Sequence, residues 1–276
     1  MNRIAIQGGL GAFHEIAAQN YFPDGGLEIV PSLTFSDLVN KASDPNLAEG
    51  GIMAIENSIA GSLLDNYRLL NTSTLNICGE VYLRIRHNLM ALPGTDLSEI
   101  NEVHSHPVAL AQCLDFFENH PRVILVESID TALSAKNIKE NNLNGIAAIA
   151  SSAAANLYDL EILSSGIEDN KQNFTRFLIL NRNKNKDTRS NKASVSFCLP
   201  HSPGSLAKIL TQLAQSGANL TKIQSVPLVG KEWQYIFFID FVQEPAQLMN
   251  SLKQLEEITI DLNILGTYQS GNYYES

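Results

Sequence analysis

The chain has 276 residues and a mass of 30.3 kDa, which corresponds to about two domains of ordinary size. Its content of 44% hydrophobic and 17% charged residues is typical of a globular protein and excludes disorder throughout. The net charge is −10, from 19 basic and 29 acidic residues. With a pI of about 5.0, this balance argues against sequence-independent binding of nucleic acid, which requires cationic patches.

The sequence carries no sign of membrane insertion or export. No apolar run reaches the roughly 18 residues of a membrane span, and the first residues lack the apolar core and cleavage site of a signal peptide. Cys78, Cys113 and Cys198 lie far apart in apolar surroundings, so we expect buried free thiols. These features predict a cytoplasmic protein that binds neither nucleic acid nor membrane.

Short apolar runs alternate with amphipathic stretches up to residue 180. A helical stripe of Leu110, Cys113, Leu114 and Phe117 follows Pro107. This alternation favours parallel sheets covered by helices, and the length favours two α/β lobes with a cleft between them. Ligands of such folds bind at the carboxyl ends of strands, near helix N-termini. Strands are predicted at residues 3–7, 27–30, 51–55, 102–105, 123–126, 146–150 and 176–180.

Residues 181–191, NRNKNKDTRSN, contain no apolar side chain and predict an exposed linker. The elements expected after it are a strand at 193–199, a helix that Ser202 caps and Gly217 ends, strands at 219–228 and 232–241 joined by a turn at 229–231, a helix carrying Leu248, Leu252 and Leu255, and a strand at 261–268. Their order, βαββαβ, is the ferredoxin-like arrangement.

A glycine-rich turn follows the first predicted strand. Gly9 and Gly11 fit a dinucleotide-binding loop, and Glu28 ends a second strand at a suitable distance. The third glycine position is occupied by His14, whose side chain would prevent close packing of the helix on the strand. A turn that presents backbone N–H groups to an anion is therefore the favoured interpretation.

Polar residues also follow three other strands. Glu56 and Asn57 are predicted site residues, whereas Ser62 has the ordinary role of capping the next helix. Thr175, flanked by the Asn173 amide and the Arg176 guanidinium, has the surroundings of a site for a polar anion.

The third of these segments is His104-Ser105-His106-Pro107, with Gln112 further along the same predicted helix. The two histidines could share a face, but no other ligands at metal-binding spacing accompany them, so no metal is expected. Ser105 and the free N–H groups at the start of the helix that begins with Pro107 are predicted to hold a carboxylate.

Taken together, these segments resemble the prephenate dehydratase family, in which an ACT regulatory domain follows the catalytic domain. The resemblance runs from about residue 3 to residue 268, and its matching stretches are QGGLGAFHEIAA, IENSIAGS, SHPVALAQC, DTALSAK and NFTRF. It implies a two-lobed, periplasmic-binding-protein-like catalytic domain over residues 1–181 and an ACT domain over 192–270. The implied reaction converts prephenate to phenylpyruvate in L-phenylalanine biosynthesis, with loss of carbon dioxide and the ring hydroxyl, and needs no cofactor or metal.

The resemblance also implies roles for individual residues. Thr175 donates a hydrogen bond or proton to the departing hydroxyl, and Glu56 orients the site. Arg176 offers its charge to a carboxylate or braces the loop. The implied substrate-binding residues are Asn57, Glu56, Ser105, Gln112 and Arg176.

The family's ACT domain binds phenylalanine at a subunit interface, which implies feedback regulation and a homodimer or homotetramer. The second ACT motif, usually Glu-Ser-Arg-Pro, reads Gln-Ser-Val-Pro at residues 224–227, so its Glu and Arg are absent. The residues implied to bind phenylalanine are Pro203, Gly204, Ser205, Leu206, Asn219, Leu220, Gln224 and Ser225.

Three other functions stay open on the sequence. Arogenate dehydratase runs the same chemistry on a substrate with an amino group in place of the keto group, and no motif separates the two. A non-catalytic amino-acid sensor is disfavoured because Asn57, Gln112 and Thr175 are present together. An NAD-dependent dehydrogenase rests on the glycine turn alone.

Overall fold

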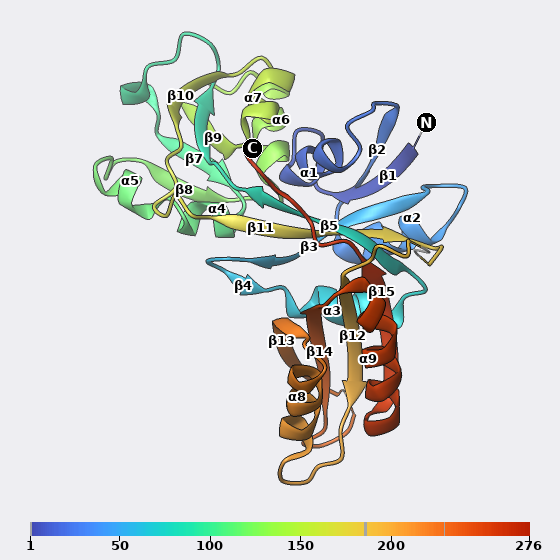
Figure 1. Cartoon of the computed structure of the whole chain (residues 1–276). Coiled ribbons are helices and arrows are strands. Elements are labelled where there is room, and N and C mark those ends of the chain that lie inside the picture. The colour runs from blue at the N-terminus through green and yellow to red at the C-terminus, as the bar shows by residue number, and fades with distance from the viewer. Residues whose placement is uncertain (1, 185–186, 229) are drawn as a thin grey trace.

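The computed structural model describes residues 2–184, 187–228 and 230–276, which form two α/β lobes and a C-terminal domain (Figure 1). The chain passes from the first lobe to the second through residues 85–87 and returns through residues 166–173. The two-lobed arrangement predicted from the sequence is confirmed. Within the described ranges, no helix has the length and apolar character needed to cross a membrane.

The first lobe contains the strands β1 (Asn2–Gln7), β2 (Leu27–Ser32), β3 (Gly50–Asn57), β4 (Gly61–Ser62), β5 (Asn76–Arg84), β11 (Phe174–Asn181) and β16 (Tyr273–Tyr274), and the helices α1 (Phe13–Tyr21), α2 (Phe35–Ser43) and α3 (Leu64–Thr72). The sheet order is β16-β5-β11-β3-β1-β2, and β4 pairs with β3. β1 is parallel to β2 and β3, but β11 is antiparallel to β3 and β5. The predicted parallel pairing holds for β1, β2 and β3 but not for β11, because β11 enters the sheet on the return from the second lobe.

The second lobe contains β6 (Asn88–Ala91), β7 (Glu102–Ser105), β8 (Ile124–Glu127), β9 (Ile146–Ala150) and β10 (Glu161–Ser165), with η1 (Leu97–Glu99), α4 (Pro107–Ala111), α5 (Leu114–Glu118), α6 (Thr131–Asn141) and α7 (Ser152–Leu157). Its sheet order is β10-β6-β9-β7-β8. The sequence analysis missed β5, β6 and β10. In β5, Val81 and Leu83 alternate with Glu80, Tyr82 and Arg84, a period of two that predicts a strand. The strands β6 and β10 are only 4 and 5 residues long, which leaves little room for a pattern. The single helical stripe predicted after Pro107 is divided between α4 and α5, and Leu114 is half exposed.

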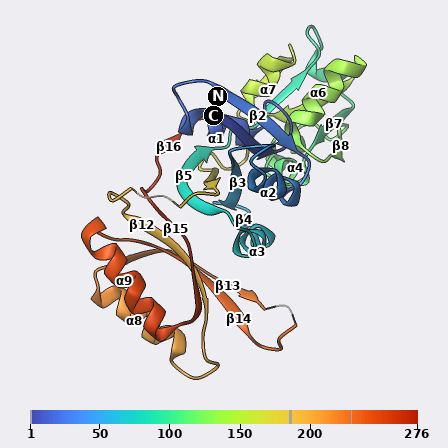
Figure 2. The ribbon, with the colours of Figure 1, turned by 90° about the vertical axis from the view of Figure 1, so that its right-hand side faces the viewer.

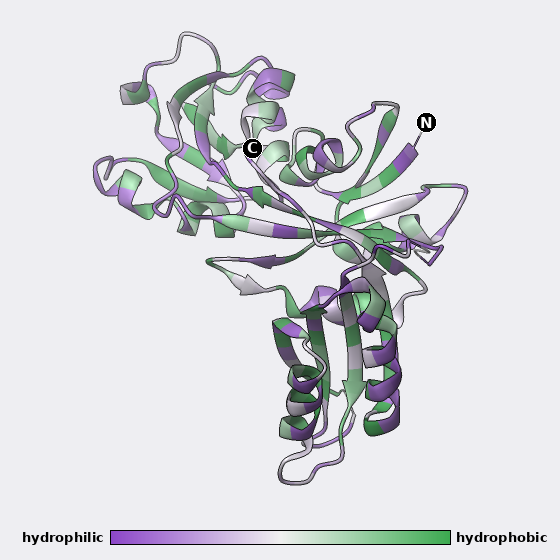
Figure 3. Ribbon diagram, in the orientation of Figure 1, coloured by the Kyte–Doolittle hydropathy of each residue, from purple (hydrophilic) through white to green (hydrophobic). Residues whose placement is uncertain are grey.

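The C-terminal domain contains β12 (Lys192–Cys198), α8 (Ser205–Gln215), β13 (Asn219–Pro227), β14 (Tyr235–Val242), α9 (Pro245–Ile258) and β15 (Ile260–Tyr268). Its sheet order, β13-β14-β12-β15, is the one a ferredoxin-like βαββαβ unit requires. Both helices cover one face of this sheet (Figure 2) and carry hydrophobic and hydrophilic residues in alternation (Figure 3). The predicted turn at 229–231 includes Val229, which lies outside the described residues.

Local details at the predicted helix ends differ from the expectations. α8 starts after Gly204, whose φ of 84° is left-handed, rather than at a Ser202 cap. Ser62 lies in β4 and does not cap α3. Gly217, at φ 78°, ends α8 as predicted. All three cysteines are free, but Cys113 alone among them is fully buried.

The first-lobe sheet and the C-terminal domain share a hydrophobic core. Side chains of α2, α3, β3 and β11 pack in one cluster with Val226, Phe238 and Leu265 of the C-terminal sheet. The opposite face of the first-lobe sheet is covered by α1, in a second cluster that includes Tyr274 of the tail. The C-terminal domain is therefore joined to the first lobe by buried apolar surface and not only by the linker at 181–191.

The tightest backbone approach between these two parts is at Gly266 of β15. A Cβ atom there would lie 2.1 Å from the carbonyl oxygen of Ile77 in β5. We predict that Gly266→Ala lowers the free energy of unfolding by about 1–3 kcal/mol, because backbone must move to admit the methyl group. Urea unfolding measures this, with Asn250→Ala at an exposed position of α9 as the control. An unchanged midpoint for Gly266→Ala would contradict the close approach.

Candidate active site

A cavity of about 360 Å³ lies between the lobes, beside the two crossovers. This volume is in the range of small-molecule sites. Both lobes and the first crossover contribute to its wall. The lining residues are Gln7, Ala12, Phe13, His14, Phe35, Ala54, Asn57, Ala60, Gly61, Ser62, Leu63, Ile85, His87, His106, Val108, Ala109, Gln112, Asp130, Thr131, Thr175 and Phe177.

The cavity wall contains helix N-termini in place of cationic side chains. It includes the N-terminal ends of α1, α3, α4 and α6, and none of the described lining residues is Lys or Arg. The N-terminus of a helix carries a partial positive charge and free N–H groups, which favour bound anions. The arrangement therefore suits an anionic ligand that is held by backbone groups and neutral side chains.

Three amide side chains form a closed ring of hydrogen bonds at the cavity. Asn57 Nδ2 donates to Asn173 Oδ1 at 2.7 Å, and Asn173 Nδ2 donates to Gln112 Oε1 at 2.8 Å. Gln112 Nε2 closes the ring on Asn57 Oδ1 at 3.4 Å. The three residues come from the end of β3, the second crossover and the C-cap of α4, so the ring ties both lobes together.

The ring fixes the direction of the hydrogen bond at Thr175. The backbone N–H groups of residues 59 and 60 donate to Asn57 Oδ1, which identifies that atom as the oxygen. The other end of the amide, Nδ2, donates to Thr175 Oγ1 at 3.0 Å. Since the Thr175 oxygen accepts this bond, its own O–H is available to donate to a ligand in the cavity.

His87 is a cavity residue that the sequence analysis missed. Its Nε2 lies 3.1 Å from Gln112 Oε1, which can only accept, so the Nε2 carries the proton. The other ring nitrogen, Nδ1, is buried without a partner among the described residues. Burial lowers the pKa of this imidazole, against smaller opposing effects of Gln112 and Glu168. His87 lies in the first crossover with no motif around it, so no sequence signal marked it.

The glycine-rich turn is occupied by the protein's own carboxylates. Gly9 N donates to Asp130 Oδ1 at 3.4 Å, and Gly11 N donates to Glu15 Oε2 at 2.6 Å. The expected role of the turn, to present N–H groups to an anion, is met within the chain. Burial raises the pKa of Asp130, which lines the cavity and caps α6.

Asn57 and Glu56 exchange the faces that strict alternation would give them. The register of β3 and β11 pairs Arg176 with Glu56 but Phe177 with Ala54, so Ile55 is an extra residue in a β-bulge. Ala54 and Asn57 both line the cavity as a result, and Glu56 lies on the other face, where its carboxylate binds Lys222 of β13. The prediction that Glu56 belongs to the substrate-binding set is wrong in this structure.

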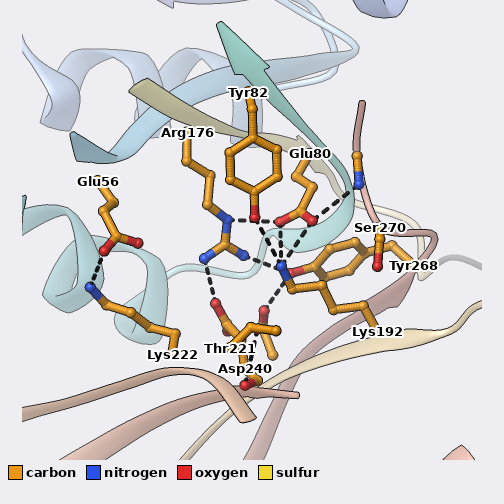
Figure 4. Close-up of polar contacts among 12 residues, drawn as sticks. Glu56, Glu80, Tyr82, Arg176, Lys192, Thr221, Lys222, Asp240, Tyr268 and Ser270 are labelled. Carbon is orange, nitrogen blue, oxygen red and sulfur yellow. Dashed lines mark hydrogen bonds and ion pairs between the residues drawn. The ribbon is translucent and has the colours of Figure 1, made fainter. Parts of the chain in front are cut away.

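Arg176 also points away from the cavity. Thr175 and Phe177 line the cavity, and the alternation along β11 puts Arg176 on the opposite face. Its guanidinium is buried and bonded to Glu80, Asp240 and Tyr268 (Figure 4). The expectation that it meets a substrate carboxylate is therefore corrected, and bracing the strand is what its contacts support.

Ser105 is buried at the end of β7 and donates to the carbonyl of Ile149, so it does not reach the cavity and its predicted carboxylate contact is not made. The neighbouring histidines have separate roles. His104 pairs with Glu102 at 2.8 Å, and His106 caps α4 through Nδ1 and lines the cavity. In the ranges that the structure describes, no group of three potential metal ligands occurs.

The two segments of the expected effector site lie apart within one chain. Ser205 and Leu206 line a cavity of about 340 Å³ on the C-terminal domain, together with Trp233 and Tyr235. Asn219, Leu220, Gln224 and Ser225 lie on β13, the edge strand, and are not among the described residues that line this cavity.

Two lobes with convergent polar groups and helix N-termini between them form a cleft that is suited to a small anionic ligand. The family model of prephenate dehydratase matches residues 4–185. The chain belongs to the prephenate dehydratase family. It is 39% identical over 280 residues to arogenate dehydratase/prephenate dehydratase 2 of Arabidopsis thaliana, a chloroplastic protein, covering 96% of this chain and 72% of that one.

Two solved structures are similar over nearly the whole chain. The prephenate dehydratase of Arthrobacter aurescens in complex with L-Phe has a TM-score of 0.85 and 28% identity, covering 97% of this chain and 90% of the other. GqqA, described as a quorum-quenching acylase, has a TM-score of 0.86 and 33% identity, covering 97% and 98%.

His14 provides a test of the buried surroundings of the cavity. Its Nε2 accepts a hydrogen bond from Ala54 N at 3.2 Å, and burial lowers the pKa of the imidazole to about 3. The unfolded chain therefore binds a proton below about pH 6.5 that the folded protein excludes, so stability rises with pH in this window. Between pH 4.5 and 6.5 we expect the free energy of unfolding to rise by about 2 kcal/mol more in the wild type than in His14→Gln.

Urea unfolding at both pH values makes this measurement. His201→Gln, at an exposed position of the C-terminal domain, is the matched control and should keep the wild-type slope. Equal slopes for the wild type and His14→Gln would show that the imidazole titrates in the folded protein.

Proposed function

We propose that this protein is a prephenate dehydratase, which converts prephenate to phenylpyruvate with loss of carbon dioxide and the ring hydroxyl. The observation that carries the proposal is the Thr175 hydroxyl, whose oxygen accepts from the Asn57 amide and whose proton is free to face the cavity. Family membership supports the reaction class, and the helix N-termini suit a dianionic substrate.

The chemistry divides into binding and departure of the hydroxyl. When the carboxylate leaves as carbon dioxide, its bonding electron pair enters the ring and expels the ring hydroxyl, and the ring becomes aromatic. Thr175 donates its hydrogen bond to the departing oxygen, which takes up one proton from the solvent and leaves as water. Help of this kind contributes typically ~10²–10⁴-fold, and positioning by both lobes supplies a further part of the rate.

Arogenate is the second candidate substrate, because the relative from Arabidopsis thaliana is named for both activities. The two substrates differ in an ammonium group, which would favour a carboxylate near it. Asp130 lines the cavity, and its Oδ1 already accepts from the N–H groups of Gly9 and Leu133. Burial also raises the pKa of this carboxyl, which makes it a poorer partner for an ammonium group. We therefore keep prephenate as the first candidate.

Acyl hydrolysis, named for one structural relative, is less well supported by the geometry. An activated nucleophile needs an adjacent base to accept its proton. The described partner of the Thr175 hydroxyl is the Asn57 amide nitrogen, which is a donor. The site therefore supports Thr175 as a hydrogen-bond donor and not as a nucleophile.

Thr175→Val keeps the size of the side chain and removes the O–H. We expect kcat for phenylpyruvate formation at neutral pH to fall by about 100-fold or more, while Thr175→Ser keeps most of the activity because it retains the donor. Both variants should unfold at close to the wild-type urea concentration. A Thr175→Val enzyme with wild-type kcat would refute the role, and turnover of arogenate alone by the wild type would refute the substrate.

We also propose that the C-terminal domain is an ACT domain that binds L-phenylalanine between two copies of this chain and inhibits the enzyme. The relative from Arthrobacter aurescens is described as a complex with L-Phe. Here Ser205 and Leu206 lie apart from the β13 residues within one chain, and β13 is an open edge of its sheet. A site completed by the partner's β13 accounts for both facts.

Asn219 tests this regulatory proposal, because it lies exposed at the start of β13. Loss of a hydrogen bond to a charged amino-acid ligand costs about 1.5–3 kcal/mol, which is roughly tenfold or more in affinity. We expect Asn219→Ala to raise the Kd for L-phenylalanine by at least that factor in equilibrium dialysis. Asn250→Ala, exposed on α9, is the control; the same Kd for both variants would contradict the assignment.

A further inference from the structure

Two residues of the cavity are each next in sequence to a residue whose side chain contacts the C-terminal domain. Asn57 and Thr175 face each other across β3 and β11, and the next pair in the same register is Glu56 and Arg176. The first pair lies on the cavity face and the second on the opposite face, where it meets the C-terminal sheet. The catalytic pair and the interdomain pair are thus one residue apart on the same two strands.

The partners of Glu56 and Arg176 are themselves a cross-strand pair. Lys222 of β13 is opposite Asp240 of β14 in the C-terminal sheet. Lys222 Nζ lies 2.6 Å from Glu56 Oε1, and the Asp240 carboxylate accepts from Arg176 Nη1 (Figure 4). Two register pairs of opposite charge therefore face each other across the domain boundary, and we call these four residues the ionic junction.

Lys222 has a second contact that leads to the cavity. Its ammonium group donates to Ser62 Oγ at 2.6 Å, and Ser62 lines the cavity. The lysine side chain is only 12% exposed, so its two bonds to Glu56 and Ser62 are largely shielded from water. A change in the position of β13 would thus reach β3 and β4 at once.

The Arg176 side of the ionic junction is more deeply buried. The guanidinium is bonded to Glu80 at 2.7 Å and to the Tyr268 hydroxyl at 3.0 Å besides Asp240. Lys192 of β12 adds a second cation to Glu80 at 2.9 Å. A buried network of this kind is a weak source of net stability but fixes the geometry of its members.

We propose that Lys222 and Asp240 are positioning residues: through Glu56 and Arg176 they hold Asn57 and Thr175 in the geometry that the reaction requires. The C-terminal domain then completes the active site without touching the substrate. This inference rests on the proposed dehydratase function. It also gives the effector site a physical route to the cavity, because Lys222 lies on β13 between Leu220 and Gln224.

Lys222→Met is the test, since it removes the ammonium group, keeps the apolar stem and leaves a Glu56 carboxylate that is already 32% exposed. We expect kcat to fall by on the order of tenfold with KM changed less than twofold, because small displacements of a catalytic group act on the transition state. Lys222→Arg, which keeps the charge, should restore part of kcat. Lys253→Met, an exposed lysine of α9, is matched in chemistry and should behave as the wild type.

A second readout does not depend on activity. The Thr175 methyl resonance, assigned by its loss in Thr175→Val, should shift in Lys222→Met and stay in place in Lys253→Met. Adding L-phenylalanine to the wild type should move the same resonance. Urea unfolding of each variant confirms that it is folded.

The outcomes separate the two proposals. A wild-type protein that turns over neither prephenate nor arogenate refutes the dehydratase function, whatever the methyl resonance does. An active wild type together with a folded Lys222→Met that keeps kcat and an unmoved Thr175 resonance refutes the ionic junction as a positioning device and leaves the function intact. A fall in kcat of equal size in Lys253→Met would also refute it. The effect would then come from the loss of one positive charge and not from the loss of the contact between Lys222 and Glu56.

Discussion

The pairing of β3 with β11 is the constraint on which the rest of the structure depends. β11 re-enters the first lobe from the second and is buried between β3 and β5, so its register is fixed by apolar side chains on both faces. Phe177 and Ile179 pack toward α1, and Leu178 and Leu180 pack toward the C-terminal domain. The polar residues at the start of β11 follow the same alternation, so that Thr175 and Arg176 lie on opposite faces of the sheet.

A single β-bulge in β3 then determines which polar residue serves which face. Ile55 is the extra residue; if the strand alternated regularly through Ile55, Glu56 would lie on the cavity face and Asn57 on the other. A carboxylate beside Thr175 would repel an anionic ligand, whereas the Asn57 amide donates to the Thr175 oxygen and frees its proton. The bulge therefore places the neutral donor at the cavity and the charge at the domain boundary.

The charged side chains are likewise kept to one of the two faces of the first-lobe sheet. The cavity is lined by amides, a hydroxyl, neutral histidines and helix N-termini. These groups attract an anion through partial charges and N–H donors and not through a strongly hydrated ammonium group. The opposite face of the sheet holds the buried cations and carboxylates, where each has a partner of opposite charge. Burial by itself would lower the pKa of Arg176, but Asp240, Tyr268 and Glu80 hold that pKa above its ordinary value. Because the C-terminal domain supplies Asp240, Tyr268 and Lys222, the first-lobe sheet without it would expose Arg176 with Glu80 as its remaining partner and Glu56 without its lysine.

The sequence by itself determined the βαββαβ order of the C-terminal domain, the two lobes, and the roles of Asn57, Gln112 and Thr175 as cavity residues, because each rests on local periodicity or on a contiguous motif. Tertiary structure alone decided the positions of Glu56, Ser105 and Arg176, which adjoin motif residues and were expected in the cavity. Their side chains point elsewhere because of a bulge, a buried strand end and the alternation of a strand that is covered on both faces. His87 joined the cavity network through a crossover whose path no local pattern encodes, since only the closure of the two lobes on one another brings it to Gln112. Asn173 lies in the NFTRF segment that the sequence singled out, but its bond to Gln112 depends on the same closure.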